Sequence, residues 1–168
     1  MKTLIGKTKF LSYLFAQNFW FSLGGPASWD DENDPTSAVN STTLITNPFV
    51  FMKVVSPKFC KIDVNGELAY GSIKLTEVLE ADWYTNYPDH IFLEVEINDS
   101  IVSYTDEWRE TGLSINTLRA TTVPSTQTVL YPNLNEVQDY GTLLSYENHT
   151  KRTIIPGETR KVLGLLEI

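Results

Sequence analysis

A series of short apolar runs, each bounded by turn-forming residues, limits the fold of this chain more than any other feature. Four runs lie between Phe49 and Ile97, at residues 49–55, 59–64, 69–75 and 91–97. Short strands at about 10-residue spacing are typical of antiparallel β-sandwiches. The Asn65-Gly66 pair between two of the runs tolerates positive φ at both central positions of a tight turn. It therefore predicts a two-residue hairpin.

The same β pattern continues through the rest of the chain, and helical patterns are few. Further strands are expected at residues 19–23, 101–104, 108–115, 118–123 and 127–131, with a closing pair in 140–148 and 162–166. Residues 8–17 have the apolar spacing of a short helix, and 76–83 can form a helical turn. We therefore predict one domain over residues 1–168, a mainly β structure of the β-sandwich type with a short N-terminal helix and long loops.

The net charge argues against two classes of partner, and the cysteine content excludes an internal disulfide. The formal net charge is -8, and a field of this sign repels phosphate backbones and anionic lipid surfaces. We therefore expect no nucleic acid and no membrane as partner. The single cysteine, Cys60, excludes an internal disulfide. We expect it to be a small buried hydrophobe.

The longest loop, residues 24–48, is interpreted as an extended arm. It carries Trp29, Asp30 and Asp31 near its start and Leu44 and Ile45 near its end, with little local means of burying the apolar ones. Ordering such a segment costs on the order of 1 kcal/mol or more per residue in backbone entropy. We therefore predict that the arm is mobile in the free monomer and contacts another subunit through these five residues.

Trp83 and Tyr84 are a second candidate interface, because Trp and Tyr are frequent hot-spot residues in protein interfaces. With Tyr87 they could alternatively form a stacking platform for a carbohydrate or receptor. Arg109 lies in a predicted strand, where a buried guanidinium needs a carboxylate. We name Glu147 as the partner in a structural ion pair.

No arrangement of residues predicts an enzyme, a cofactor or a metal site. The chain has neither a glycine-rich phosphate loop nor a nucleophile elbow, and His90 and His149 are interpreted as surface or turn histidines. The acidic run from Asp30 to Asp34 lacks the glycine and the closing glutamate of a calcium loop. It is better explained as a solvated turn in which Asp side chains cap backbone N–H groups.

Three separate motifs carry a resemblance to a known family. Residues 29–35 read Trp-x-Asp-Glu-Asn-x-Pro, residues 108–112 read Trp-Arg-x-x-Gly, and residues 140–148 read Tyr-Gly-Thr-Leu-Leu-x-Tyr-Glu-Asn. Arg152 and Glu158 then precede an apolar last strand. This order resembles a tailed-bacteriophage baseplate wedge subunit, the β-rich wedge protein best known from T-even phages. The first motif and the closing segment are expected to be partners in the fold.

The chain departs from that family in length and in detail. It lacks the large middle insertion of the best-known member, has only Pro35 where a proline pair is usual, and has Glu110 where glutamine is more common. A shortened wedge subunit and a tail-adaptor relative both fit these departures.

The resemblance implies a structural subunit that connects neighbouring tail proteins during virion assembly. Its expected partners are other phage tail or baseplate proteins and copies of itself in a symmetric ring or wedge. Its expected location is the virion tail, after synthesis in the host cytoplasm. The alternative reading is a carbohydrate- or receptor-binding β-sandwich module of a phage tail, with Trp83, Tyr84 and Tyr87 in its site.

Overall fold

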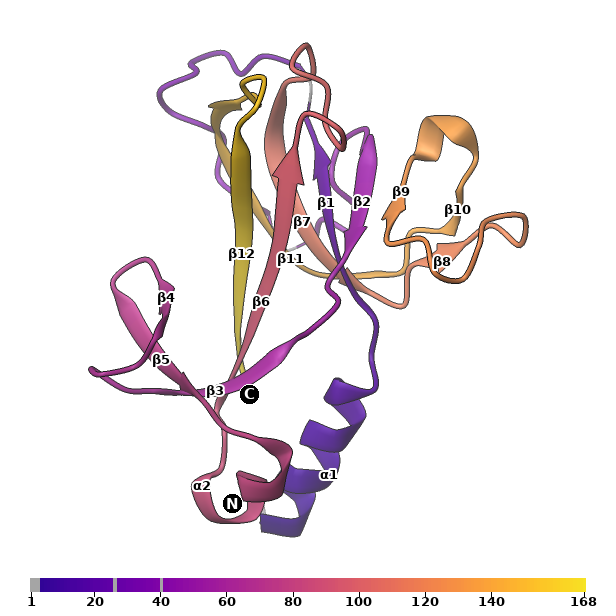
Figure 1. The fold of residues 1–168 in the computed structure, drawn as a ribbon. Coiled ribbons are helices and arrows are strands. Elements are labelled where there is room, and N and C mark those ends of the chain that lie inside the picture. Colours follow the sequence, from indigo (N-terminus) through magenta and orange to yellow (C-terminus); the bar gives the residue numbers. More distant parts are fainter. Residues whose placement is uncertain (1–3, 26, 40) are drawn as a thin grey trace. The chain divides into compact units, whose positions relative to one another are not determined.

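The structure is a computed structural model that describes residues 4–25, 27–39 and 41–168 (Figure 1). It is mainly β, with a short N-terminal helix and long loops, so the predicted fold class is confirmed. The elements are α1 (Leu4–Phe15), β1 (Phe19–Gly24), β2 (Val50–Lys53), β3 (Lys58–Ile62), β4 (Leu68–Tyr70), β5 (Ile73–Glu77), the 3-10 turn η1 (Glu80–Asp82), α2 (Trp83–Asn86), β6 (His90–Asn98), β7 (Trp108–Ile115), β8 (Leu118–Arg119), β9 (Val129–Leu130), the 3-10 turn η2 (Pro132–Leu134), β10 (Val137–Asp139), β11 (Thr142–Arg152) and β12 (Thr159–Glu167).

The chain divides into two compact units, which are described one at a time. Unit 1 contains residues 4–17, 56–94 and 163–168, and unit 2 contains the described residues of 18–55 and 95–162. The strands β6 and β12 each run from one unit into the other. No helix in the described part of the chain is long and apolar enough to cross a membrane.

Unit 2 is built on an antiparallel sheet in the order β11-β7-β1-β2-β9. Its strand β1 is flanked by β2 and β7, with Phe21 opposite both Met52 and Leu113. All six residues of β1 are buried, which explains why its sequence is an apolar run without alternation. Trp20, Phe51 and Leu130 form a core cluster in this unit. A separate two-stranded ribbon pairs β8 with β10.

Unit 1 contains β3, β4 and β5 in a sheet whose order is β12-β6-β3-β5-β4. Cys60, Leu75 and Phe92 form its core cluster, and Leu163 and Leu165 pack against it. Cys60 is fully buried, as expected. Burial also raises the pKa of its thiol to about 11, so the sulfur stays protonated at neutral pH.

The hairpin predicted at Asn65-Gly66 is wrong, because β3 pairs with β5 and leaves β4 at the sheet edge. The residues instead form a turn in which the Gly66 N–H donates to the Asp63 carbonyl at 2.8 Å, and neither Asn65 nor Gly66 has positive φ. The Asp63 carboxylate accepts the Asn65 N–H at 2.9 Å. Asp at the first and Gly at the fourth position suit a type I turn.

The strand predicted at residues 101–104 is also wrong. The N–H groups of Ile101 and Val102 both donate to the Asn98 carbonyl, at 3.0 Å each, and the Asn98 side chain accepts the Ser100 N–H at 3.0 Å. These local bonds compete with a sheet ladder and make the segment a turn. Residues 137–139, which lie outside the predicted strands, form a short strand, β10.

Candidate functional site: a strap around strand β11

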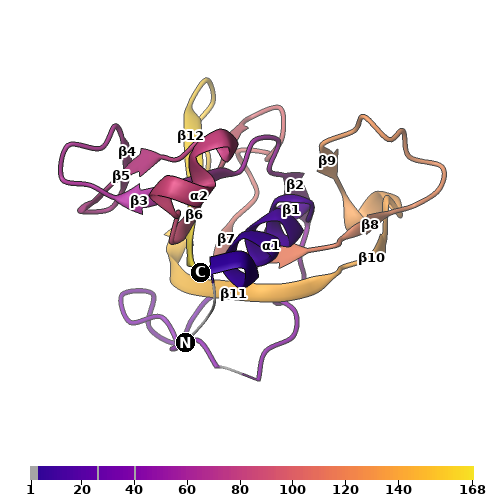
Figure 2. The same ribbon diagram turned by 90° about the horizontal axis from the view of Figure 1, so that it is seen from below.

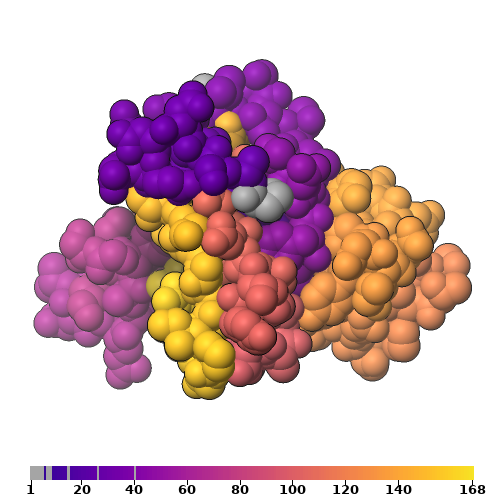
Figure 3. Space-filling view, turned by 90° about the horizontal axis from the view of Figure 1, so that it is seen from above, coloured from indigo at the N-terminus to yellow at the C-terminus, as the bar shows by residue number. Residues whose placement is uncertain are grey.

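The long loop between β1 and β2 is held against unit 2, and we call its described residues from 25 to 49 the strap. Because β1 and β2 are paired, the strap leaves and re-enters the sheet at the same place. The Gly25 N–H donates to the Thr46 carbonyl at 2.7 Å, and the Phe49 N–H donates to the Leu23 carbonyl at 3.0 Å. In the space-filling view of Figure 3, the strap (indigo to purple) lies directly against salmon and yellow atoms of the later chain.

Arg109 of β7 is the centre of an ion-pair network that holds the first part of the strap. Its side chain is only 2% exposed. Its Nε and Nη2 atoms each lie 2.8 Å from Glu32 Oε1 in the strap, and Nη2 lies 3.3 Å from Glu107 Oε2. Lys151 of β11 reaches the other oxygen of Glu107 at 3.2 Å. Two cations and two carboxylates therefore connect the strap, β7 and β11.

The network favours the charged forms of Arg109 and of its two carboxylate partners. The hydrogen bond between Glu32 and Arg109 lowers the pKa of the Glu32 carboxyl and raises the pKa of the guanidinium. The hydrogen bond from Lys151 lowers the pKa of Glu107. The sequence analysis named Glu147 as the partner of Arg109, and this prediction is wrong. The partners are Glu32 and Glu107. Glu147 is exposed and lies opposite Thr111 in the register.

Trp29 joins the strap to β11 through the main chain of a buried histidine. Its indole N–H donates to the His149 carbonyl at 3.0 Å. The His149 ring is close to the Thr150 carbonyl through Nδ1, at 2.8 Å, and to the Thr111 hydroxyl through Nε2, at 3.0 Å. Burial lowers the pKa of His149, so the neutral ring with its proton on Nδ1 fits both contacts. His149 is 5% exposed, so the expectation of a surface or turn histidine is wrong.

A second group of contacts holds the later part of the strap. The Glu110 carboxylate accepts the Thr46 N–H at 2.5 Å, and the Asn148 side-chain amide donates to the Thr36 carbonyl at 2.6 Å. The Tyr146 hydroxyl accepts hydrogen bonds from the Val39 N–H and from the Thr42 hydroxyl. Most of these bonds run from a strand side chain to the strap backbone.

The two groups of contacts lie on opposite faces of the sheet. Successive side chains of a strand point to opposite faces, so Arg109 and Glu110 of β7 face different ways. In β11 the register places Tyr146 opposite Gly112 and Asn148 opposite Glu110. The part of the strap that contains Trp29 and Glu32 therefore contacts one face of the sheet, and the part from Thr36 onward contacts the other face. Between these two parts, near Pro35, the strap passes around the edge strand β11. Figure 2 shows the strap running alongside β11.

This arrangement corrects the expectation that the arm lacks local partners. Of the described residues between 27 and 49, Ile45 alone is fully buried, with 2% of its surface exposed. Polar side chains of β7 and β11 supply the remaining attachment. The argument that the segment must dock on another subunit to become ordered therefore fails.

The other candidate interface residues have mixed positions. Asp30 and Asp31 are exposed, and Asp31 accepts the Asn33 N–H at 2.9 Å, which confirms the capped turn. Leu44 and Tyr84 are exposed, by 37% and 63%.

Ile45 and Trp83 are buried in the cores of their own units and are corrected to packing residues. The indole N–H of Trp83 donates to the Val78 carbonyl at 3.0 Å, and its ring centroid lies 4.7 Å from that of Phe59. Because its ring is buried, Trp83 cannot stack on a ligand together with Tyr84 and Tyr87.

Sequence reasoning missed the residues of β7 and β11 that hold the strap. These residues are Glu110, Thr111, Tyr146, Asn148 and His149. A signal for part of them was present, because the closing motif contains Tyr146 and Asn148 two residues apart, on one face of a strand. The expected partnership between the first motif and the closing segment is confirmed by the bond between Trp29 and His149. Within the described residues there is no cluster of three His, Cys, Asp or Glu side chains that could hold a metal ion.

The family model described as "Baseplate wedge 3 tail fiber network component" matches residues 1–167. The chain belongs to that family. It is a component of the bacteriophage baseplate that interacts with other baseplate or tail proteins, and the resemblance seen in the sequence is confirmed. A comparison with curated proteins found no match.

Proposed function

We propose that this protein is a non-catalytic connecting subunit that joins neighbouring tail proteins during assembly of the virion. The observation that carries the proposal is the family match over residues 1–167, which spans both units and the strap. A connecting subunit needs surfaces that keep their shape before the partner arrives, because ordering a loop on binding costs affinity. The strap meets this requirement, since it is fastened on both faces of its sheet.

We further propose that several copies occupy equivalent positions in a symmetric ring or wedge. Homo-oligomeric assemblies are built by symmetry operators that repeat the same contact. Exposed residues such as Leu44 on the strap and Tyr84 in unit 1 are available for such contacts.

A phage in which the gene is interrupted tests the connecting role. We expect tails without complete baseplates under the electron microscope, and complete baseplates after the protein is supplied from a plasmid. Complete baseplates in its absence would refute the proposal. The non-catalytic role is tested with purified protein on host cell-wall and surface polysaccharides, where we expect no release of fragments.

A further inference from the structure

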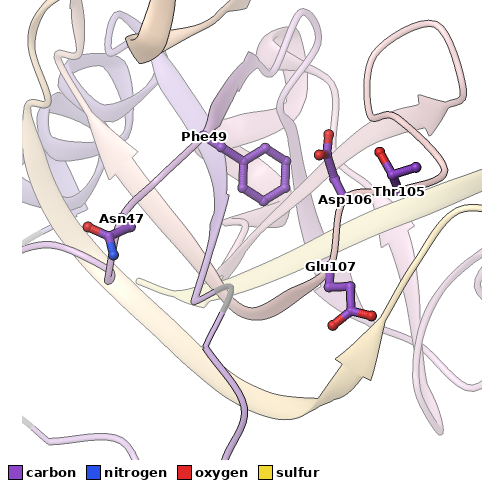
Figure 4. A pocket seen from close by; sticks show the side chains of 5 residues that line it. All are labelled: Asn47, Phe49, Thr105, Asp106 and Glu107. Carbon is purple, nitrogen blue, oxygen red and sulfur yellow. The ribbon is translucent and has the colours of Figure 1, made fainter.

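The end of the strap forms one wall of a cavity in unit 2. The cavity has a volume of about 370 Å³ and is lined by Asn47, Phe49, Thr105, Asp106 and Glu107 (Figure 4). Two of these residues end the strap, and three form the turn before β7. That turn is fixed by two reciprocal bonds, from the Asp106 N–H to the Ser103 carbonyl at 2.9 Å and from the Ser103 N–H to Asp106 Oδ2 at 3.1 Å. This wall is therefore held by hydrogen bonds of the turn itself.

The two carboxylates of the cavity differ in what they already bind. The Glu107 carboxylate is paired with two cations, Lys151 at one oxygen and Arg109 at the other. Asp106 takes part in no ion pair among the described residues and accepts only the backbone bond from Ser103. It is half-buried. The cavity therefore contains one carboxylate that lacks a cation.

An aromatic ring stands next to that carboxylate. Figure 4 shows the Phe49 ring directed towards the side of Asp106 and Thr105, while the carboxylate of Glu107 points away from the ring. A ring face attracts a cation placed over it, and a carboxylate forms its strongest hydrogen bonds with charged donors. The Thr105 hydroxyl, which lies 2.9 Å from the Ser103 hydroxyl, adds a neutral acceptor.

We propose that this cavity binds the guanidinium of an arginine side chain presented by a neighbouring baseplate protein. The proposal rests on the connecting function proposed above. A planar cation with five donors can lie on the ring of Phe49 and donate to Asp106, which the rounder ammonium of lysine does less well. The net charge of -8 also attracts a basic partner. The cavity volume is within the range of sites that bind small groups.

The test uses the full chain, labelled with ¹⁵N, and three small probes in an NMR titration. The probes are N-acetyl-arginine methylamide, the same derivative of lysine, and the same derivative of citrulline, which has the shape of arginine without the charge. We expect the arginine probe to shift the amide signals of residues 47–49 and 105–107 with a Kd of a few millimolar. The lysine probe should bind several-fold more weakly, and the citrulline probe should give no saturable shift.

Two variants link the binding to the cavity. Asp106→Asn removes the charge but keeps an oxygen for the Ser103 N–H, and it should weaken arginine binding by about fivefold or more. Glu67→Gln is the matched control, since Glu67 is exposed in unit 1 and its change removes the same charge. It should leave the Kd unchanged.

Three results would overturn the proposal: no shift of these amides with arginine, equal shifts with citrulline, or an unchanged Kd in Asp106→Asn. Tighter binding of N-acetylglucosamine than of the arginine probe would also overturn it and assign the cavity to a sugar. In the phage, Asp106→Asn should lower the yield of complete baseplates. A failure of the connecting function itself would be recognised differently, as complete baseplates in particles that lack the whole protein.

Discussion

Replacing Ile45 by alanine measures how much the buried side chain of the strap contributes to its attachment. Ile45 packs over two residues without side chains. A Cβ added at Gly112 would lie 2.9 Å from Ile45 Cγ2, and one added at Gly24 would lie 3.0 Å from Ile45 Cδ1. Alanine removes three carbon atoms, which at about 0.8 kcal/mol each amounts to about 2.4 kcal/mol of lost burial. The cavity left behind brings the expected cost to about 2–5 kcal/mol.

The neighbouring residue supplies the control. Leu44 is 37% exposed, so Leu44→Ala should cost less than about 1 kcal/mol. Urea denaturation gives the global cost, and hydrogen exchange at the Gly25 and Thr46 amides gives the cost of opening the strap. In Ile45→Ala we expect these two amides to exchange about 30-fold faster or more, which corresponds to about 2 kcal/mol. Equal costs for the two variants, or unchanged exchange, would refute the reasoning.

Adding a methyl group at Gly112 gives an independent check on the contact between Ile45 and Gly112. A methyl group at position 112 would lie 2.7 Å from Ser22 Oγ as well as 2.9 Å from Ile45. Gly112→Ala should therefore cost about 1–3 kcal/mol through overpacking. Combining it with Ile45→Ala should cost less than the sum of the two single changes, because the space vacated by isoleucine relieves part of the clash. Strict additivity would show that Ile45 and position 112 do not share space.

Three further predictions concern polar groups. Burial lowers the pKa of His149, so the unfolded chain, whose histidine titrates near pH 6.5, binds a proton before the folded one does. Stability should therefore fall as the pH is lowered from about 7 to 5, and His149→Gln should reduce that slope; an unchanged slope would assign it to other groups. Arg109→Gln and Glu32→Gln should be coupled in a double-mutant cycle, whereas Arg109→Gln and Glu147→Gln should be additive. Because Asp31 caps its own turn, millimolar calcium should not raise the melting temperature; an increase of several degrees would show a metal site.

The fold class could be predicted because strands with a buried side leave a direct mark on the sequence. The apolar runs at residues 19–23 and 91–97 correspond closely to β1 and β6. Pairing could not be predicted in the same way. The Asn65-Gly66 signal describes a local preference, whereas the contact of β3 with β5 depends on a more distant strand, and Gly66 is required for another reason. A Cβ there would lie 2.3 Å from the backbone of Leu75.

The strap shows why the site was harder to predict than the fold. Counting apolar residues indicated a loop with nothing to hold it, and the count was correct, because only Ile45 is fully buried among the described residues from 27 to 49. The attachment comes largely from polar side chains that bind groups distant in sequence: Glu110 binds Thr46, 64 positions away, and Asn148 binds Thr36, 112 positions away. No sequence pattern specifies such a pair, because almost any loop residue offers a carbonyl. The choice of Glu147 for Arg109 failed because the chain has 21 acidic residues and no sequence pattern indicates which of them lies beside the guanidinium.

Unit 1 is assembled from three separate stretches of the chain, so its core can be completed only late in synthesis. Unit 1 takes α1 from the start of the chain, β3, β4, β5, α2 and the first part of β6 from the middle, and Leu163 and Leu165 from the last stretch. Until residue 165 has been synthesised, the chain lacks two of the five side chains that pack against the apolar cluster of Cys60, Leu75 and Phe92. Contacts this distant in sequence form slowly, and exposed apolar surface invites aggregation while they form. A chain that ends before Leu163 lacks both of these side chains, so part of the cluster stays exposed to solvent.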